Sequence, residues 1–108
     1  MILVLEYIDP RGRSPYAKWF DRLPAQAAAK VAVAVNRMSR GNLSNVKSVG
    51  EGVLEYRIDW GPGYRIYIGR DREELILLLG GGTKKGQQDD IDRAKERWKD
   101  YQKRNKQE

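Results

Sequence analysis

Apolar and polar residues alternate along two consecutive segments, residues 54–60 and 64–68, which a Gly-Pro-Gly turn separates. Alternation with a period of two is typical of a strand that buries one face, so the segments predict an antiparallel hairpin. Opposing residues share a side of the sheet, which places Arg57 on the same face as Arg65 and Tyr67. A register centred on the first glycine of the turn makes the two arginines direct neighbours. The apolar positions are Leu54, Tyr56, Ile58 and Trp60 in the first segment, and Tyr64, Ile66 and Ile68 in the second.

Two arginines side by side need an explanation, because like charges opposite each other destabilise a sheet by about 0.2–1 kcal/mol. On one interpretation, Glu55 and Asp59 neutralise them on an ordinary solvated face. On the other, the arginines form an anion site, since the planar guanidinium group matches the geometry of a phosphate. The hairpin pattern alone leaves both interpretations open.

A third segment, residues 73–79, ends in five consecutive apolar residues and predicts a central strand that is buried on both faces. We expect it to stop at three glycines, residues 80–82, which let a ligand approach the main chain closely. Lys84 and Lys85 follow, so the sequence predicts a basic strand-to-helix loop beside the hairpin. Aspartates in the first turn of the next helix are expected to stabilise its dipole. These aspartates are Asp89, Asp90 and Asp92.

The rest of the chain predicts one further strand and three helices. Ser14 is expected to cap the first helix, with Pro15 in its first turn. Residues 42–52 are expected to be a loop that carries Lys47. The order strand, helix, helix, three strands, helix indicates a single α+β domain over residues 1–108, with a mainly antiparallel sheet. The other predicted elements are a strand at residues 2–8, helices at 15–23 and 25–39, and a C-terminal helix at 87–103, after which the chain is expected to fray.

The composition narrows the chemistry that this domain can carry. No cysteine or histidine is present, so the usual metal ligands, general bases and thiol nucleophiles are absent, and we expect no metal and no cofactor. No apolar run approaches the roughly 20 residues that span a bilayer, and we expect a cytoplasmic protein without a membrane partner. The net charge of +6 favours an anionic partner such as nucleic acid, the ribosome or an acidic protein.

The second half of the chain resembles a known family. It holds Gly-Glu-Gly at residues 50–52, Gly-Pro-Gly-Tyr-Arg at 61–65 and Leu-Leu-Gly-Gly-Gly-Thr-Lys at 78–84, in this order. Together with the upstream helical hairpin, these motifs are similar to the RelE/HigB superfamily of toxins from type II toxin-antitoxin modules, in its short addiction module killer protein branch. Thr83 and Lys85 depart from that branch, which more often has Asp and Ser there.

The resemblance implies a RelE-like fold and an endoribonuclease, an mRNA interferase, that cuts mRNA in the ribosomal A site without a metal. It places Arg65 at the position that holds the scissile phosphate, Arg57 near the basic residues of the preceding strand and Lys84 at the basic position after the glycines. The implied partners are a cognate helix-turn-helix antitoxin, mRNA on the ribosome and, through the antitoxin, operator DNA. The tyrosine or histidine that some relatives place at the start of the last helix has no counterpart, and Asp90 and Ile91 fall near its position.

RNA can be cut without a metal when its own 2′-hydroxyl attacks the adjacent phosphorus. The two arginines suit the task of stabilising the phosphate, because arginine stays charged and binds phosphate in a forked geometry. Lys84 or Lys85, Tyr67 and Glu55 are candidates for moving protons, and the residues alone leave that choice open. The candidate catalytic residues are Arg57, Arg65, Lys84 and Tyr67, and the candidate RNA-binding residues are Lys47, Arg70, Lys85 and Gln88.

Two other functions fit the same residues. The basic face can belong to a non-catalytic module that docks on nucleic acid or on an acidic antitoxin segment. The domain can also be a degenerate toxin that retains only antitoxin and DNA association. For a pure binder, replacing Arg65 or Lys84 is expected to weaken binding and reduce its salt dependence without changing any RNA product.

Overall fold

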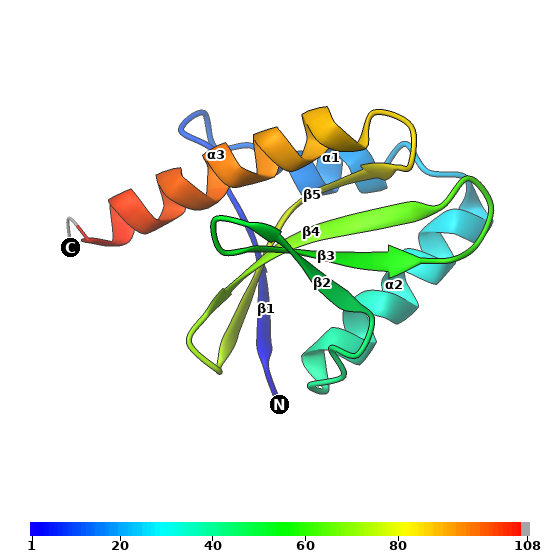
Figure 1. The fold of residues 1–108 in the computed structure, drawn as a ribbon, viewed down its shortest axis with the longest axis horizontal. Helices are drawn as coiled ribbons and strands as arrows, with labels where there is room; N and C mark the ends of the chain where they lie inside the picture. The colour runs from blue at the N-terminus through cyan, green and yellow to red at the C-terminus, as the bar shows by residue number, and fades with distance from the viewer. Residues whose placement is uncertain (107–108) are drawn as a thin grey trace.

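The computed structural model describes residues 1–106 of the 108-residue chain. A five-stranded sheet, in the order β1-β5-β4-β3-β2, forms the middle of the molecule (Figure 1). β1 runs parallel to β5, and the other neighbouring strands are antiparallel, which confirms the predicted α+β class with a mainly antiparallel sheet. In chain order the elements are β1 (Leu3–Glu6), α1 (Pro15–Phe20), α2 (Ala25–Ser39), β2 (Val46–Gly50), β3 (Val53–Ile58), β4 (Tyr64–Asp71), β5 (Leu75–Thr83) and α3 (Gln87–Lys106).

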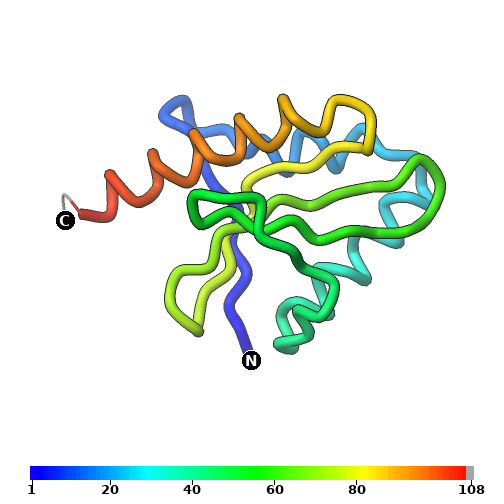
Figure 2. The backbone as a smooth tube through the Cα atoms, in the orientation of Figure 1, coloured from blue at the N-terminus to red at the C-terminus, as the bar shows by residue number. Residues whose placement is uncertain are grey.

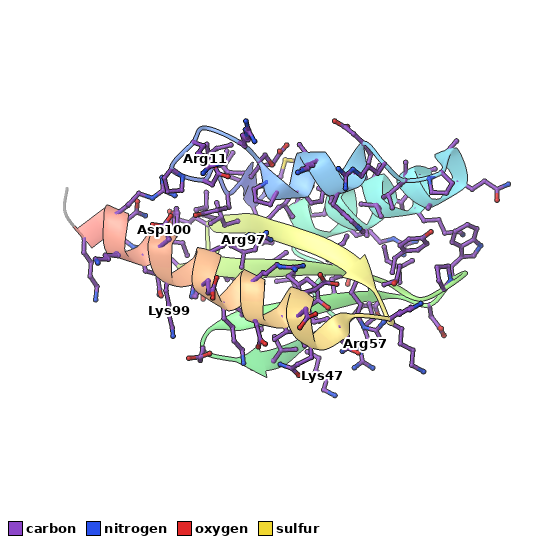
Figure 3. The ribbon with its side chains drawn as sticks, turned by 90° about the horizontal axis from the view of Figure 1, so that it is seen from above. Arg11, Lys47, Arg57, Arg97, Lys99 and Asp100 are labelled. Carbon is purple, nitrogen blue, oxygen red and sulfur yellow. The ribbon has the colours of Figure 1, made fainter. Side chains whose placement is uncertain are left out.

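Helices cover both faces of the sheet, with α3 on one face and α1 and α2 on the other (Figures 1 and 3). Under α1 and α2, an apolar cluster joins Val31 and Met38 of α2 to Ile66 of β4 and Ile76 of β5. Under α3, a second cluster surrounds Trp98. The backbone trace shows that the C-terminal end of α3 continues past the edge of the sheet (Figure 2).

The predicted helices are confirmed. The Ser14 hydroxyl accepts a hydrogen bond from the backbone N–H of Ala17 at 3.0 Å, and Pro15 is the first residue of α1. α1 ends before the predicted limit at Leu23, and α3 runs from the predicted Gln87 beyond its predicted end. The expected fraying falls in part on residues 107–108, which lie outside the described residues. Within residues 1–106, no helix combines the length and the apolar character that crossing a membrane requires.

The register of the central hairpin is also confirmed, since Arg57 of β3 lies opposite Arg65 of β4. On the next pair of the same face, Glu55 lies opposite Tyr67. The turn between the strands is therefore centred as the alternation predicts. The first strand is shorter than its predicted range, 2–8, because only Leu3–Glu6 pairs with β5.

The prediction of a loop over residues 42–52 is wrong, because Val46–Gly50 forms β2, an edge strand that pairs with β3. β2 places Lys47 opposite Glu55. The turn that follows has left-handed backbone at Gly50, Glu51 and Gly52, with φ angles of 101°, 55° and 85°. Asparagine, serine and glycine are poor strand residues, so local preference did not indicate a strand that pairing with β3 stabilises.

The prediction that the third strand of the run stops at Gly80 is also wrong. β5 continues through the three glycines to Thr83, and Gly80, Gly81 and Gly82 pair with residues 65–67 of β4. The glycines here serve close packing. A Cβ added at Gly81 would lie 2.5 Å from the Trp19 ring, and one at Gly82 would collide with the Asp90 carboxylate.

Candidate functional site

Two arginines lie side by side near the turn that joins β3 to β4. Arg57 and Arg65 are direct partners in the antiparallel register, on the face of the sheet that α3 covers. Arg57 has 48% of its side chain exposed, whereas Arg65 has 9%. Arg57 lies near the start of α3 in Figure 3. The pair is therefore open to solvent at Arg57 and nearly closed at Arg65.

A buried carboxylate holds the two arginines together. Glu55 has a fully buried side chain, and its Oε1 atom accepts a hydrogen bond from Arg57 Nε at 2.7 Å. The same oxygen lies 3.5 Å from Arg65 Nε. The other oxygen, Oε2, accepts a hydrogen bond from Gln87 Nε2 at 2.9 Å. One carboxylate therefore offsets the repulsion between two neighbouring cations. Gln87, the first residue of α3, is the third side chain that contacts this carboxylate.

The protonation state of Glu55 follows from these contacts. Burial by itself raises the pKa of the Glu55 carboxyl, but hydrogen bonds from Arg57 and Gln87 and the charges of both arginines outweigh it. The pKa is lowered as a result, and Glu55 is ionised at neutral pH. A lowered pKa is typical of a carboxylate that serves as a fixed counter-ion. A carboxylate that acts as a general base at neutral pH needs the opposite, a raised pKa.

The interpretation of an ordinary solvated face is thus wrong. Glu55 does neutralise the arginines, but it does so under α3 and out of solvent. Asp59 is exposed, and none of the ion pairs within residues 1–106 involves it. The alternation pattern could not show this, because a period of two says which residues share a face and leaves open what covers it.

Arg65 is oriented by the β3–β4 turn. Its Nη1 atom donates a hydrogen bond to the Gly63 carbonyl at 3.1 Å, and the backbone N–H of Lys84 donates to the same carbonyl at 3.0 Å. Among buried side-chain atoms of residues 1–106, Arg65 Nε is one of two without a hydrogen bond, because its contact with Glu55 is too long for one. The second arginine therefore keeps unused donor capacity.

Tyr67 is placed differently from its prediction as a catalytic residue. It lies opposite Glu55 on the same face but is 1% exposed, and its hydroxyl is the other buried atom without a hydrogen bond. Burial, followed by the negative charges of Glu55 and Asp90, raises the pKa of the Tyr67 hydroxyl above its ordinary value of 10.0. The Tyr67 hydroxyl therefore stays protonated and neutral, because it is buried beneath the arginines.

Asp90 joins the site from α3. Its carboxylate lies against the main chain at Gly82, the residue of β5 that pairs with Arg65. Burial is the largest cause that raises the pKa of Asp90; the nearby Asp89 acts in the same direction and Arg93 opposes it. The sequence explained this aspartate by the helix dipole, and the family resemblance placed it near the position of the tyrosine or histidine that some relatives carry. The three-glycine run was the available signal, since residues without a Cβ mark a place where another group approaches the strand.

The predicted lysines lie at the same end of the sheet as the arginines. Lys84 and Lys85 are exposed and follow β5 directly. Lys84 also borders a hollow of about 530 Å³ with Gln87 and Gln88 at the start of α3. The Gln88 side chain is exposed and donates a hydrogen bond to Asp92 at 2.9 Å. Lys84 and Gln88, which were predicted, therefore lie beside Gln87, which sequence reasoning missed. Gln87 connects them to the arginine pair through its hydrogen bond to Glu55.

The last two predicted RNA-binding residues separate. Lys47 is exposed on β2 opposite Glu55, so it borders the arginine pair. Arg70 lies toward the other end of β4, five residues beyond Arg65, a separation of about 16 Å along a strand. Its guanidinium group donates to the carbonyl of Glu73 at 3.1 Å. Arg70 therefore does not share this site. No group of three or more acidic side chains within residues 1–106 is placed to hold a metal ion.

Comparison with known proteins gives the family. The family model described as "Phage derived protein Gp49-like (DUF891)" matches residues 18–99, which include every site residue named above. A protein of Haemophilus influenzae described as uncharacterized is 40% identical over 81 residues, which cover 74% of this chain and 82% of that protein.

Comparison of folds agrees with this assignment. A chain of the toxin-antitoxin complex RelBE2 from Mycobacterium tuberculosis superposes with a TM-score of 0.59 at 20% identity, over 77% of this chain and 98% of that chain. At this identity the match shows the fold, and it confirms the RelE-like fold that the sequence resemblance implied. The chain belongs to the Gp49-like family of phage-derived toxins of addiction modules.

Proposed function

We propose that this protein is a ribosome-dependent mRNA endonuclease that needs no metal and is held inactive by a cognate antitoxin. The observation that supports the proposal most strongly is the pair of arginines held side by side by one buried carboxylate. A structural ion pair needs one arginine for one carboxylate. Here the pair carries an excess positive charge at the open end of a sheet, which is the arrangement that a phosphate group would complete.

The two arginines would divide the work of binding the scissile phosphate. Arg57 is half-exposed, so it can meet the RNA first, while its hydrogen bond to Glu55 fixes the direction of the guanidinium group. Arg65 is more deeply set, and its guanidinium group is held between Glu55 and the carbonyl of Gly63. Because the surrounding protein excludes water, donors that are already in place stabilise charge on the phosphate more than the same groups would in water.

The proposed reaction uses the RNA's own nucleophile. The 2′-oxygen attacks the adjacent phosphorus and forms the 2′,3′-cyclic phosphate, the bond from phosphorus to the 5′-oxygen breaks, and the 5′-oxygen leaves as a hydroxyl. One proton must leave the 2′-hydroxyl and one must reach the 5′-oxygen. The arginines stabilise the additional negative charge on the phosphate oxygens between these two events.

Asp90 and Lys84 are the groups best placed for proton transfer. Asp90 is partly buried beside Gly82, and its raised pKa is the direction that proton transfer near neutral pH requires. Lys84 is exposed on the same end of the sheet and is tied through its backbone to the turn that orients Arg65. Tyr67 would pack beneath the arginines and would take no part in proton transfer, because its enclosed hydroxyl has no access to solvent.

This set of groups is small, which supports dependence on the ribosome. One proton-transfer group contributes about 10²- to 10⁴-fold in rate, and the present cluster has no histidine to serve two such roles. Holding the RNA in a conformation ready for attack can contribute far more. A ribosome that holds the mRNA would supply that contribution, and the net charge of +6 favours association with such an anionic particle.

The test compares induced expression of the wild type, Arg65→Ala and Arg70→Ala in bacteria, with growth followed and mRNA 5′ ends mapped. Arg70 is a matched control, because it is an arginine of the same strand outside the site. We expect growth arrest and new cuts in translated frames for the wild type and Arg70→Ala, and loss of both for Arg65→Ala. Arg57→Ala, which alters a half-exposed side chain, should show the same loss and guards against misfolding of the Arg65 variant.

Unimpaired growth and unchanged mRNA ends with soluble wild-type protein would contradict the proposal. Retained RNA binding in that case would identify the non-catalytic binding module. Antitoxin binding without RNA binding would identify the degenerate toxin.

A further inference from the structure

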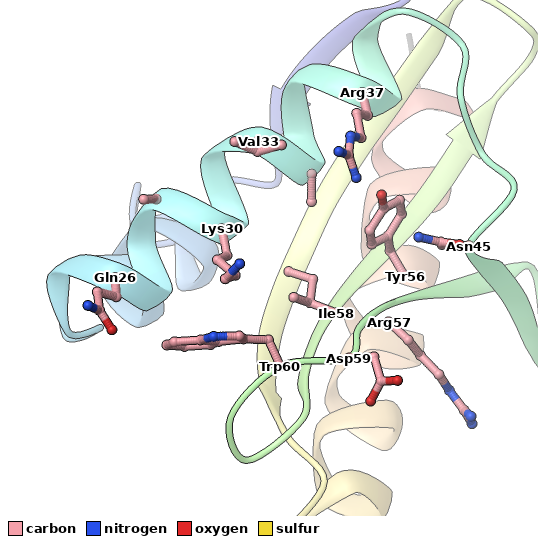
Figure 4. Close-up of a pocket in the computed structure, with 12 residues that line it drawn as sticks. Gln26, Lys30, Val33, Arg37, Asn45, Tyr56, Arg57, Ile58, Asp59 and Trp60 are labelled. Atoms are coloured by element: carbon pink, nitrogen blue, oxygen red, sulfur yellow. The ribbon is translucent and has the colours of Figure 1, made fainter.

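A groove runs between α2 and the end of β3, on the side of the sheet away from α3 (Figure 4). Its volume is about 680 Å³. Gln26, Lys30, Val33 and Arg37 line it from α2, and Ile58 and Trp60 face them from the hairpin (Figure 4). β2 pairs with β3 only as far as Tyr56, so the end of β3 that borders the groove has no neighbouring strand on that side.

The groove has an apolar floor and basic edges. Val33 is 49% exposed, and Ala29 and Ala34 line the groove beside it. α2 contains no acidic residue over its fifteen positions. The charged residues that line the groove are Lys30, Arg37 and Arg57, with Asp59 as the one acid. Its chemistry complements a segment that is both apolar and acidic.

The aromatic ring in the groove is already engaged. Lys30 Nζ lies over the Trp60 ring at 5.4 Å from its centroid, and the Tyr64 ring stacks on Trp60 with centroids 6.1 Å apart and an interplanar angle of 22°. A nucleobase that stacked here would have to displace one of these contacts. A protein segment needs no free ring face, because it can pack its side chains on the apolar floor.

We propose that this groove is the docking site for an acidic amphipathic segment of the antitoxin. The stretch of α2 from Gln26 to Arg37 is about 16 Å long, which matches about three turns of a helix laid alongside it. Apolar residues on one side of the segment would cover Val33, and carboxylates on its edges would pair with Lys30 and Arg37. The identity of the occupant as an antitoxin rests on the function proposed above, whereas the groove and its chemistry do not.

The position of the groove also connects it to the arginine pair. Arg57 lies at the groove's edge, and its side chain runs away from α2 (Figure 4). Its Nε atom donates a hydrogen bond to Glu55. A segment that fills the groove and continues past the end of β3 would therefore come within reach of Arg57. Carboxylates there would compete with the RNA phosphate for the same guanidinium group.

The test uses the antitoxin encoded beside the gene, purified alone, and measures its dissociation constant for the full-length toxin by calorimetry. Val33→Glu places a negative charge on the floor of the groove, at an exposed position that the fold tolerates. We expect it to weaken binding by at least about tenfold, because the new charge must be buried against an acidic partner. Leu3→Glu is the matched control: Leu3 is a 58% exposed apolar residue on β1 at the opposite edge of the sheet, and this change should leave the affinity within about twofold.

A second variant tests the charge complementarity. Arg37→Gln should weaken binding at low salt and reduce the dependence of the affinity on salt concentration, because it removes one cation from the edge of the groove. In cells, toxin with Val33→Glu should still arrest growth but should no longer be neutralised by co-expressed antitoxin, whereas toxin with Leu3→Glu should be neutralised.

The outcomes separate the two proposals. Antitoxin that binds Val33→Glu as tightly as the wild type, or that fails to bind the wild type, overturns the groove assignment. If tight antitoxin binding persists while Val33→Glu loses growth arrest, the groove serves RNA or the ribosome, which also overturns it. A wild type that neither arrests growth nor cuts mRNA, yet binds the antitoxin in a manner sensitive to Val33→Glu, refutes the endonuclease and leaves the groove assignment standing.

Discussion

The two faces of the sheet are both covered by helices, but among residues 1–106 the buried charged side chains, Glu55 and Arg65, lie on the face under α3. Under α1 and α2, Val31, Met38 and Ile66 belong to a cluster of buried hydrophobic residues. Under α3, the packing around Trp98 is apolar. Toward the start of α3, Glu55 and its two arginines replace this apolar packing. Burying ionised groups costs several kcal/mol for each ion, which apolar residues of the same size would avoid.

This difference indicates what each face does. The residues of the apolar face stabilise the fold through hydrophobic burial and can be exchanged for others of similar volume. The charged end of the other face contributes little net stability for the polar groups that it buries. It also leaves two of them, Arg65 Nε and the Tyr67 hydroxyl, without hydrogen bonds. A buried charged cluster that adds little to stability is better explained by a binding site than by the needs of the core.

The largest effect on stability is expected from the apolar face. Ile66→Ala removes a fully buried side chain between α2 and the sheet and should lower the free energy of unfolding by about 4 kcal/mol, through lost burial and an unfilled cavity. Urea denaturation measures it. Cleavage per folded molecule should be unchanged, so a selective loss of activity would contradict the division between the two faces.

The charged end should show both effects together. Glu55→Gln keeps the shape of the side chain but leaves Arg65 buried beside Arg57 without a counter-charge. The free energy of unfolding should fall by about 3 kcal/mol, near the lower end for a broken buried pair because Arg57 is half-exposed. Growth arrest should be lost as well. Retention of full stability would mean that the arginines do not depend on Glu55.

The same variant should alter the pH dependence of stability. The pKa of Glu55 in the folded state lies below its usual value of 4.5, so its ionisation stabilises the fold above about pH 4.5. This contribution is lost as the pH falls through the lowered pKa. The wild type should therefore lose more stability on acidification than Glu55→Gln. Thermal unfolding between pH 7 and pH 3 measures the difference, and parallel curves for the two proteins would contradict it.

The smallest effect is expected at Arg70. Its side chain is exposed and donates one hydrogen bond to the Glu73 carbonyl at the far end of β4, so Arg70→Ala should change the free energy of unfolding by no more than about 0.5 kcal/mol. Growth arrest and the positions of mRNA cuts should match the wild type. A clear loss of cleavage would extend the RNA-binding surface along the whole strand and would weaken the assignment of the site to the arginine pair.

Part of this site could be predicted from the sequence. The neighbouring positions of Arg57 and Arg65 follow from alternation on two strands and the centre of one turn, both of which are local. The N-terminal helices follow from the cap at Ser14 and from apolar spacing in the alanine-rich stretch. These features depend on residues that are close in the sequence.

The rest depends on contacts between distant segments. Glu55 and Gln87 are 32 residues apart in the sequence, and no local pattern shows that α3 seals the arginine face. β2 was missed because its strand is stabilised by pairing with β3. The glycines were expected in a loop, whereas the packing of Trp19 and Asp90 against them requires strand residues without side chains.

The most direct test of the proposed chemistry uses purified protein with a single mRNA, either translated by ribosomes or naked, and identifies the chemical ends of the products. We expect cuts in the translated mRNA that carry a 2′,3′-cyclic phosphate and a 5′-hydroxyl, very little cleavage of the naked RNA, and no cleavage by Arg65→Ala. Equal cleavage of naked and translated RNA would contradict dependence on the ribosome. Undiminished cleavage by folded Arg65→Ala would contradict the role of the arginine pair.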